Sequence, residues 1–385
     1  MRLQPFAYIK EPIVESGGGG ATAFPDQSLA TWTATQATQW KDYGTAKLNP
    51  TDFGYASSTT RIGSNFGTGA AKWFGGSLAN NGKIYCPPHV RTKWAIIDTS
   101  NDTITESSAT VNNSNQGSVY DKISQQVIAF GDSGTVIDVS NDVATDITSG
   151  PVNRSCNPVQ GFVGNDIYTT TFAIGTVKVS KYDVSTGNTT QLSPTGDSVT
   201  TQGEIGTLGV DGCMYMPSVA SGGPIMKYNP ATNVNTNFTP PGSQTYTTIV
   251  QHYDGYLYFF PLGTDAGDIR GYDPATDSWV STINWGTGFN TNNCCIGLDG
   301  KIYAVTGQAQ STIKIYDPVN GTTGDATISN SDSSYQGITM GANGDLYLIP
   351  WTGGYFHKLA LTTGTGTPAT DIVSQYNFGG RLCWG

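Results

Sequence analysis

The chain has 385 residues, and its 49 Gly and 19 Pro residues indicate many turns between short elements. Charged residues make up 12% and aromatic residues 11%, which excludes an intrinsically disordered chain, since disorder favours charge over aromatic side chains. The net charge of −10 leaves no electrostatic surface for nucleic acid or for an anionic membrane. Six cysteines without regular spacing predict free thiols, and together with three histidines they do not have the spacing of a zinc site.

Residues 1–28 precede the regular part of the sequence. Prolines and charged residues interrupt every apolar run there, so no secretory signal peptide is visible, and no 18-residue apolar stretch predicts a membrane span. The glycine run at 17–20 is typical of a flexible linker. The apolar residues before it predict an extended arm, which either folds back on the protein or anchors it to a larger assembly. The candidate anchoring residues are Phe6, Tyr8, Ile9 and Ile13.

Residues 29–70 have the pattern of an incomplete β-sheet unit. The segment 31–36 alternates polar and apolar residues as a strand does. Lys47-Leu48-Asn49-Pro50 is similar to the turn at Lys227-Tyr228-Asn229-Pro230 in a later, complete unit. We interpret 29–70 as strands two to four of a unit that lacks its first strand.

A repeat with a period of about 44 residues fills 71–375. Its most regular part is a turn with Gly or Asn, followed by an apolar residue and a tyrosine. These tyrosines are Tyr85, Tyr168, Tyr215, Tyr258, Tyr303 and Tyr347. A degenerate copy at Val127-Ile128 lies in the one gap of double length and makes seven copies. A later strand in each copy ends in an Asx turn, as at Asp273-Pro274. Four antiparallel strands per repeat predict the blade of a β-propeller.

The C-terminal segment 376–385 predicts how the ring closes. Phe378-Gly379-Gly380 is similar to Phe74-Gly75-Gly76, which opens the first clear repeat. The C-terminus would then supply the innermost strand that 29–70 lacks, so that both ends share one blade and no edge is exposed. We therefore predict an all-β propeller over 29–385 with eight four-stranded antiparallel blades. The alternative is seven blades, with 29–70 as a separate lid.

The repeat resembles that of the kelch family. The segment Tyr272 to Trp279 resembles the kelch turn-and-tryptophan signature, and the Asp-Gly-x-Ile-Tyr strand at 299–303 resembles the second kelch strand. The resemblance covers about 70–375 and is strongest over 205–350. It implies a kelch-like β-propeller repeat protein, of the kind found among tailed-bacteriophage virion proteins.

The loops between the second and third strands of the blades are variable and bear aromatic residues. In a four-stranded blade these loops emerge on one face, where binding residues are usually presented by a rigid scaffold. Their aromatic rings suit contact with a sugar or a protein partner. The candidate binding-face residues are His89, Arg91, Trp94, Phe172, Phe260, Trp351, Tyr355 and His357. No catalytic motif stands out, and we assign no catalytic, cofactor-binding or metal-binding residue.

The sequence thus predicts a non-enzymatic structural or interaction protein. The leading hypothesis is a phage virion component (a decoration, tail or fibre module) that attaches through its N-terminal arm to other virion or assembly proteins. The second hypothesis is a carbohydrate-binding or carbohydrate-cleaving propeller that recognises a cell-surface glycan. The third is a cytoplasmic scaffold for another protein.

Overall fold

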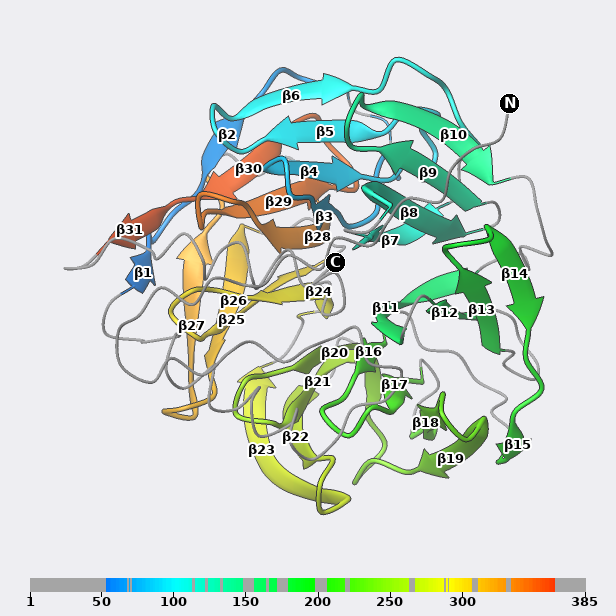
Figure 1. Cartoon of the computed structure of the whole chain (residues 1–385). Coiled ribbons are helices and arrows are strands. Elements are labelled where there is room, and N and C mark those ends of the chain that lie inside the picture. The colour runs from blue at the N-terminus through cyan, green and yellow to red at the C-terminus, as the bar shows by residue number, and fades with distance from the viewer. Residues whose placement is uncertain are drawn as a thin grey trace, which may run out of the picture.

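A computed structural model describes residues 53–363, apart from 68, 70, 113–114, 122–123, 132–133, 148–155, 164–165, 172–178, 198–205, 219–221, 263–266, 287–288, 290, 307–310 and 330–333. The predicted arm, the segment 376–385 and Phe172 therefore lie outside the described residues. Among the described residues there is no helix with the length and apolar character needed to cross a membrane. All regular elements are strands, set as twisted sheets around a central axis (Figure 1). The predicted β-propeller is confirmed.

Three blades come from the first half of the chain, each an antiparallel sheet whose strands follow one another outwards from the axis. Blade 1 has β3 (Ser77–Leu78), β4 (Lys83–Cys86), β5 (Ala95–Asp98) and β6 (Thr103–Glu106). Blade 2 has β7 (Asn115–Asp121), β8 (Gln126–Gly131), β9 (Gly134–Asp138) and β10 (Val143–Ile147). Blade 3 has β11 (Cys156–Val163), β12 (Asp166–Thr171), β13 (Val179–Asp183) and β14 (Asn188–Gln191).

Three further blades follow in the same order. Blade 4 has β16 (Thr207–Leu208), β17 (Met214–Met216), β18 (Ile225–Asn229) and β19 (Val234–Phe238), with β15 (Thr195–Gly196) added parallel to β19. Blade 5 has β20 (Thr245–Gln251), β21 (Leu257–Leu262), β22 (Gly267–Asp273) and β23 (Ser278–Gly286). Blade 6 has β24 (Thr291–Ile296), β25 (Ile302–Thr306), β26 (Thr312–Asp317) and β27 (Thr322–Thr327).

Blade 7 closes the ring with strands from both sides of the repeat region. It has β28 (Tyr335–Met340), β29 (Leu346–Pro350) and β30 (Phe356–Leu359), and its outer strand is β2 (Thr60–Ile62), which pairs antiparallel with β30. Next to it, β1 (Phe53–Tyr55) pairs with β31 (Leu361–Thr363). Because the chain after β30 pairs with β1, the outer position of blade 7 is left for a strand that precedes blade 1.

The described residues form seven blades, so the prediction of eight is wrong and the alternative count of seven is correct. Of the segment 29–70, residues 29–52 lie outside the described residues, and β2 in the rest completes the seventh blade. The ring is therefore closed by an N-terminal outer strand, which ties the two ends of the repeat region together and covers the edge of β30.

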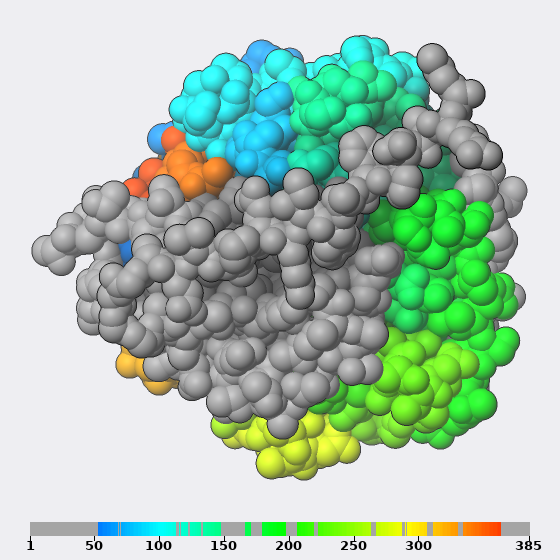
Figure 2. Space-filling model, viewed as in Figure 1, coloured from blue at the N-terminus to red at the C-terminus, as the bar shows by residue number. Residues whose placement is uncertain are grey.

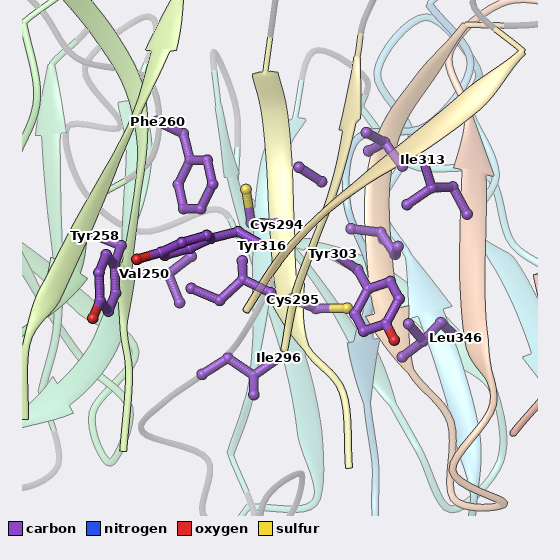
Figure 3. Packing of buried hydrophobic residues seen from close by; sticks show 14 of the residues in the cluster. Val250, Tyr258, Phe260, Cys294, Cys295, Ile296, Tyr303, Ile313, Tyr316 and Leu346 are labelled. Carbon is purple, nitrogen blue, oxygen red and sulfur yellow. The ribbon is translucent and has the colours of Figure 1, made fainter. Parts of the chain in front are cut away.

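Buried apolar residues cluster at every junction between neighbouring blades. The cluster that spans blades 5, 6 and 7 includes Tyr258, Cys295 and Leu346 (Figure 3). The other five lie between blades 1 and 2, 7 and 1, 3 and 4, 4 and 5, and 2 and 3. In the space-filling view the surfaces of blades 1 and 2 adjoin at the rim (Figure 2). A single blade has no core of its own, so the ring is stabilised by burial between blades.

The predicted register of the repeat is confirmed by the tyrosines. All six lie on the second strands of their blades and are at most 6% exposed. The degenerate copy places Ile128, which is fully buried, at the same position of β8. In blade 6 the Tyr303 hydroxyl donates to Asp299 Oδ2 (2.8 Å) in the preceding turn. A Cβ at Gly297 would come within 2.8 Å of the Tyr303 ring, so this close approach requires glycine.

The four cysteines whose side chains are described are free, as predicted. Cys86, Cys213, Cys294 and Cys295 are all buried. Burial raises the pKa of the Cys86 and Cys295 thiols, so these groups behave as small apolar side chains of the core.

Candidate binding face

Three of the predicted binding residues are interior. Trp94, Phe260 and His357 are fully buried. Trp94 packs in the cluster between blades 1 and 2, Phe260 packs edge-on against Trp285 (5.5 Å between ring centroids), and His357 Nδ1 lies 3.0 Å from Thr59 Oγ1. The prediction of a surface role is wrong for these three, because they lie within or next to strands whose side chains point between sheets rather than on the loops.

Four predicted residues, His89, Arg91, Trp351 and Tyr355, are half-buried and lie on the loops of blades 1 and 7. The His89 and Trp351 rings are 4.8 Å apart. Phe74, which leads into blade 1, contacts both rings, at 5.8 Å from Trp351 and 6.0 Å from His89. We call Phe74, His89 and Trp351 the aromatic cluster. It brings together residues more than 250 positions apart, where the seventh blade meets the first.

Backbone hydrogen bonds fix the loops that carry this cluster. His89 N–H donates to Lys72 O (2.9 Å), and Lys72 N–H donates to Trp351 O (3.2 Å). Trp351 N–H in turn donates to Ser334 O (2.8 Å) at the start of blade 7. The segment before blade 1 therefore lies between the two loops and bonds to both. These hydrogen bonds hold the loops in place, so the side chains of the aromatic cluster lose little conformational entropy when they bind a partner.

The His89 ring is oriented by a backbone carbonyl. Its Nδ1 lies 3.0 Å from Asn115 O, and because a carbonyl only accepts, Nδ1 carries the hydrogen. In the neutral ring Nε2 is then an acceptor. Asn115 itself is fully buried, and its Nδ2 donates to Pro88 O (3.0 Å) while its Oδ1 has no hydrogen-bond partner.

Cationic side chains surround the aromatic cluster. The Arg61 guanidinium lies 4.4 Å from the centroid of the Tyr355 ring, and that of Arg91 lies 5.7 Å from the Trp73 ring. Lys72 is buried, and its ammonium donates to the carbonyl oxygens of Gly69 and Gly353. The Arg91 guanidinium also lies 3.9 Å from Glu106 Oε1, and the Lys72 ammonium is bonded to carbonyl oxygens, so the protein itself supplies partners for both positive charges.

Three residues of the site, Phe74, Lys72 and Asn115, are not predicted from the sequence. Phe74 was noted only as part of the Phe-Gly-Gly segment that opens blade 1, and Lys72 carries no local pattern, because its carbonyl partner at 353 is distant in sequence. Within the described ranges, no group of three or more His, Cys, Asp or Glu side chains is placed to hold a metal ion. The arrangement is suited to binding through aromatic, amide and guanidinium groups.

Comparison with known proteins gives the fold and not a family. No protein-family model and no curated protein matches the sequence. Among solved structures, a streptogramin B lyase is 16% identical with a TM-score of 0.64, over 81% of this chain and 98% of that one. A virginiamycin B lyase from Staphylococcus aureus is 13% identical with a TM-score of 0.63, over 80% and 100%. The WD40 propeller domain of Doa1 is 14% identical with a TM-score of 0.57, over 81% and 98%.

These proteins are similar to the chain in architecture, which extends over nearly the whole length of each. At such identities the likeness does not carry an activity, because one fold hosts unrelated functions. The neighbours include lyases as well as a WD40 domain, so their names do not decide whether this chain is an enzyme.

Proposed function

We propose that this protein is a non-enzymatic interaction protein that binds its partner through the aromatic cluster and the adjoining residues Arg91 and Tyr355. The observation that carries the proposal is the half-buried His89–Trp351 pair, held by backbone hydrogen bonds where blades 7 and 1 meet. Tryptophan, tyrosine and arginine are the residues that most often dominate the energy of protein interfaces. Their rigid placement lowers the entropy lost on binding.

The finer form of the proposal is a virion component of a tailed phage. In this form the protein attaches to other virion proteins through residues 1–28 and presents the face at blades 7 and 1. The kelch-like repeat and the acidic, Gly-rich composition support it.

Site-specific photo-crosslinking tests the proposal in the particles or cells that contain the protein. A photoreactive residue replaces Tyr355 on the proposed face. As a control, it replaces Val319, which is 62% exposed on the turn between β26 and β27 of blade 6. We expect one dominant protein adduct from position 355, its loss with Trp351→Ala, and no such adduct from position 319. Equal labelling from both positions, or none from 355, would overturn the proposed face.

A further inference from the structure

The innermost strands of the blades share a local irregularity. In β7, β20, β24 and β28 the pairing with the second strand shifts register near the start of the strand, and in β11 it shifts further along, between Pro158 and Phe162. Such a β-bulge re-aims a side chain and is over-represented next to functional sites. An irregularity that recurs at the start of the innermost strand in four blades is a feature of the repeat.

The bulges contain polar, uncharged residues. The bulged residue is Thr247 in blade 5, Asn292 in blade 6 and Gln336 in blade 7. The bulged stretches of β7 and β11 contain the sequences Gln116-Gly117 and Gln160-Gly161, and Gln336 is likewise followed by glycine. We call Thr247, Asn292 and Gln336 the amide belt.

Side-chain hydrogen bonds connect the amide belt from blade to blade. Thr247 Oγ1 donates to the backbone oxygen of Thr291, the residue before Asn292, and Asn292 Nδ2 donates to Gln336 Oε1 (2.5 Å). These bonds use only part of the capacity of the two amides, since each amide has two N–H donors and an oxygen that accepts twice.

Two asparagines beside the bulges have polar atoms that the protein leaves unused. Asn293, directly after the bulge of β24, is fully buried, and neither its Oδ1 nor its Nδ2 has a hydrogen-bond partner. Asn115, directly before the bulge of β7, is fully buried with an unpartnered Oδ1. A buried amide atom without a partner costs about 1–3 kcal/mol. Such a group needs a further partner, which an ordered water or a bound polar molecule supplies.

The amide belt is continuous with the aromatic cluster. Ser334, two residues before Gln336, accepts the hydrogen bond from Trp351 N–H. A Cβ at Gly337 would lie 2.7 Å from Gly75 Cα, so the bulge of blade 7 packs directly on the residue after Phe74. On the other side, Asn115 O accepts from the His89 ring. Backbone contacts therefore connect the bulges of blades 7 and 2 with the loops that carry the aromatic cluster.

We propose that the amide belt and the aromatic cluster together bind a neutral saccharide, an inference that rests on the binding face of the proposed function. An amide offers a donor and an acceptor side by side, which matches two neighbouring hydroxyl groups of a sugar. An aromatic ring such as that of Trp351 covers the apolar face of a sugar ring. The belt is uncharged, so it does not compensate the desolvation of a carboxylate or phosphate.

Isothermal titration calorimetry with the full chain tests the inference. The probes are neutral hexasaccharides of α-1,4-glucose, β-1,4-glucose, mannose and N-acetylglucosamine, with sialyllactose as the charged probe. We expect binding of at least one neutral probe, and an affinity at least tenfold weaker with Trp351→Ala and with Gln336→Leu.

Matched controls separate the site from the fold. Trp279→Ala removes a partly buried tryptophan on the outer strand β23, and Gln191→Leu changes a glutamine at the end of the outer strand β14. Both should leave the affinity within twofold of the wild type. If Gln336→Leu does not fold, the half-buried Asn292 gives a second test as Asn292→Ala.

The outcomes distinguish this inference from the proposed function. No binding of any neutral probe to the wild type, tighter binding of sialyllactose, or equal losses in the site and control variants would each overturn the saccharide. In all three cases a crosslink from position 355 would still support a protein partner. Saccharide binding without a crosslink would instead show that the ligand of this face is the sugar alone.

Discussion

Blades 4 to 6 and blades 1 and 7 use the same tyrosine in two different ways. In blades 4, 5 and 6 the residue four positions before the tyrosine is an aspartate, which accepts from the hydroxyl at 2.7 to 2.8 Å. In blades 1 and 7 the same position is an asparagine, Asn81 or Asn343, whose Nδ2 donates to the hydroxyl at 2.8 and 3.0 Å.

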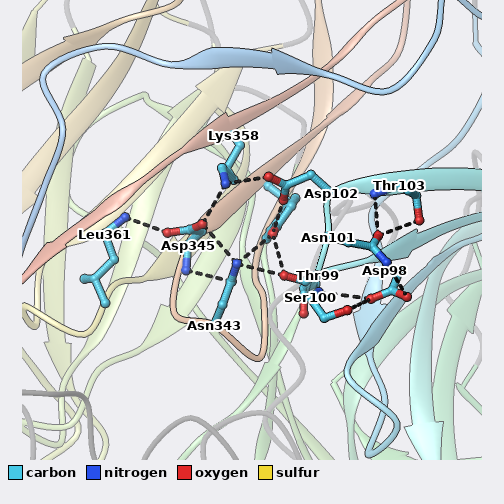
Figure 4. Close-up of polar contacts among 11 residues, drawn as sticks. Asp98, Thr99, Ser100, Asn101, Asp102, Thr103, Asn343, Asp345, Lys358 and Leu361 are labelled. Carbon is cyan, nitrogen blue, oxygen red and sulfur yellow. Dashed lines mark hydrogen bonds and ion pairs between the residues drawn. The ribbon is translucent and has the colours of Figure 1, made fainter.

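The exchange of an acceptor for a donor redirects the hydroxyl hydrogen. Tyr347 OH donates to Asp102 Oδ1 of blade 1 (2.8 Å), and Tyr85 OH donates to Asp142 Oδ1 of blade 2 (2.5 Å). Lys358 joins the first of these contacts at 2.6 Å from Asp102 Oδ2 (Figure 4). In blades 4 to 6 the tyrosine hydroxyl thus donates to the turn of its own blade, whereas in blades 7 and 1 it donates to the next blade. The bond of Tyr347 lies where blade 7 meets blade 1 and the ring closes, and that of Tyr85 lies at the next junction, between blades 1 and 2.

The largest effect that we expect concerns the tyrosine of an aspartate blade. Tyr303→Ala removes a ring that is 2% exposed and packs between blades 6 and 7, and should lower the free energy of unfolding by about 3–5 kcal/mol. Tyr303→Phe keeps the ring but leaves Asp299, whose pKa is raised by burial, without its hydroxyl donor. Tyr303→Phe should lower the free energy of unfolding by about 1–3 kcal/mol. Urea unfolding measures both, and a cost below about 1 kcal/mol for the alanine variant would contradict the repeat register.

A smaller loss of stability should follow from removing the polar contact between blades 7 and 1. Asp102→Ala removes the acceptor of both Tyr347 and Lys358, and since the Lys358 and Asp102 side chains are 18% and 30% exposed, we expect a cost of about 1–3 kcal/mol. The control is Asp325→Ala, which breaks the more exposed Lys314–Asp325 pair at 2.9 Å within blade 6. That variant should cost less than about 1 kcal/mol. If both variants lose the same free energy of unfolding in urea, the contact between blades 7 and 1 stabilises the protein no more than an exposed ion pair within a blade.

Converting an asparagine blade into an aspartate blade should be harmful at neutral pH. Asn343→Asp places a carboxylate next to Asp345, whose Oδ2 now accepts from Asn343 Nδ2 at 3.0 Å, and competes with Asp102 for the Tyr347 hydrogen. We expect the free energy of unfolding to fall by about 1–2 kcal/mol at pH 7. Because repulsion raises the pKa of the new carboxyl in the folded state, the loss should shrink as the pH falls through that pKa.

The measurement is the free energy of unfolding of Asn343→Asp at pH 7 and pH 4. The reverse exchange, Asp299→Asn, is the control, since it introduces no charge and should not become less harmful at low pH. A penalty for Asn343→Asp that is the same at both pH values would contradict the charge argument.

Local sequence predicted the blades because each blade is a local structure. The turn, the tyrosine and the Asx turn recur within about 44 residues, so their period reports the sheet directly. The blade count failed because it depends on one long-range pairing. The outer strand β2 is Thr-Arg-Ile, which carries no trace of the repeat, and its partner β30 lies almost 300 positions later.

The binding face was predicted only in part for a related reason. Whether Trp94 or Trp351 reaches the surface depends on where a strand gives way to its loop, and the aromatic residues alone do not indicate that boundary. The amide belt, in contrast, was available in the sequence. Gln-Gly recurs in the bulges of β7 and β28, at 116–117 and 336–337, and in β11 at 160–161, but its meaning depends on the bulges that the structure reveals.

The smallest effect that we expect concerns the Asx turns at the outer rim, which also come in two kinds. In blades 1 to 3 the turn begins with Asp98, Asp138 or Asp183, and the serine two residues later donates to it from its hydroxyl and its N–H. Blade 4 has Asn229, which accepts from Ala231 N–H at 2.9 Å. The serine hydroxyl, followed by the backbone N–H, holds the pKa of Asp98 and Asp138 below the usual value, and the Ser185 hydroxyl does the same for the pKa of Asp183.

A carboxyl whose pKa is lower in the folded than in the unfolded chain contributes stability above the unfolded pKa of about 3.9, and this contribution is lost as the pH falls through the folded pKa. Replacing all three aspartates by asparagine keeps the turn, as Asn229 shows, and removes this pH dependence. The melting temperature of the triple variant, followed by circular dichroism from pH 7 to pH 2, should therefore be slightly lower than that of the wild type at pH 7. It should also fall less steeply below about pH 4. A variant whose melting temperature falls as steeply as that of the wild type would show that the acid sensitivity lies elsewhere.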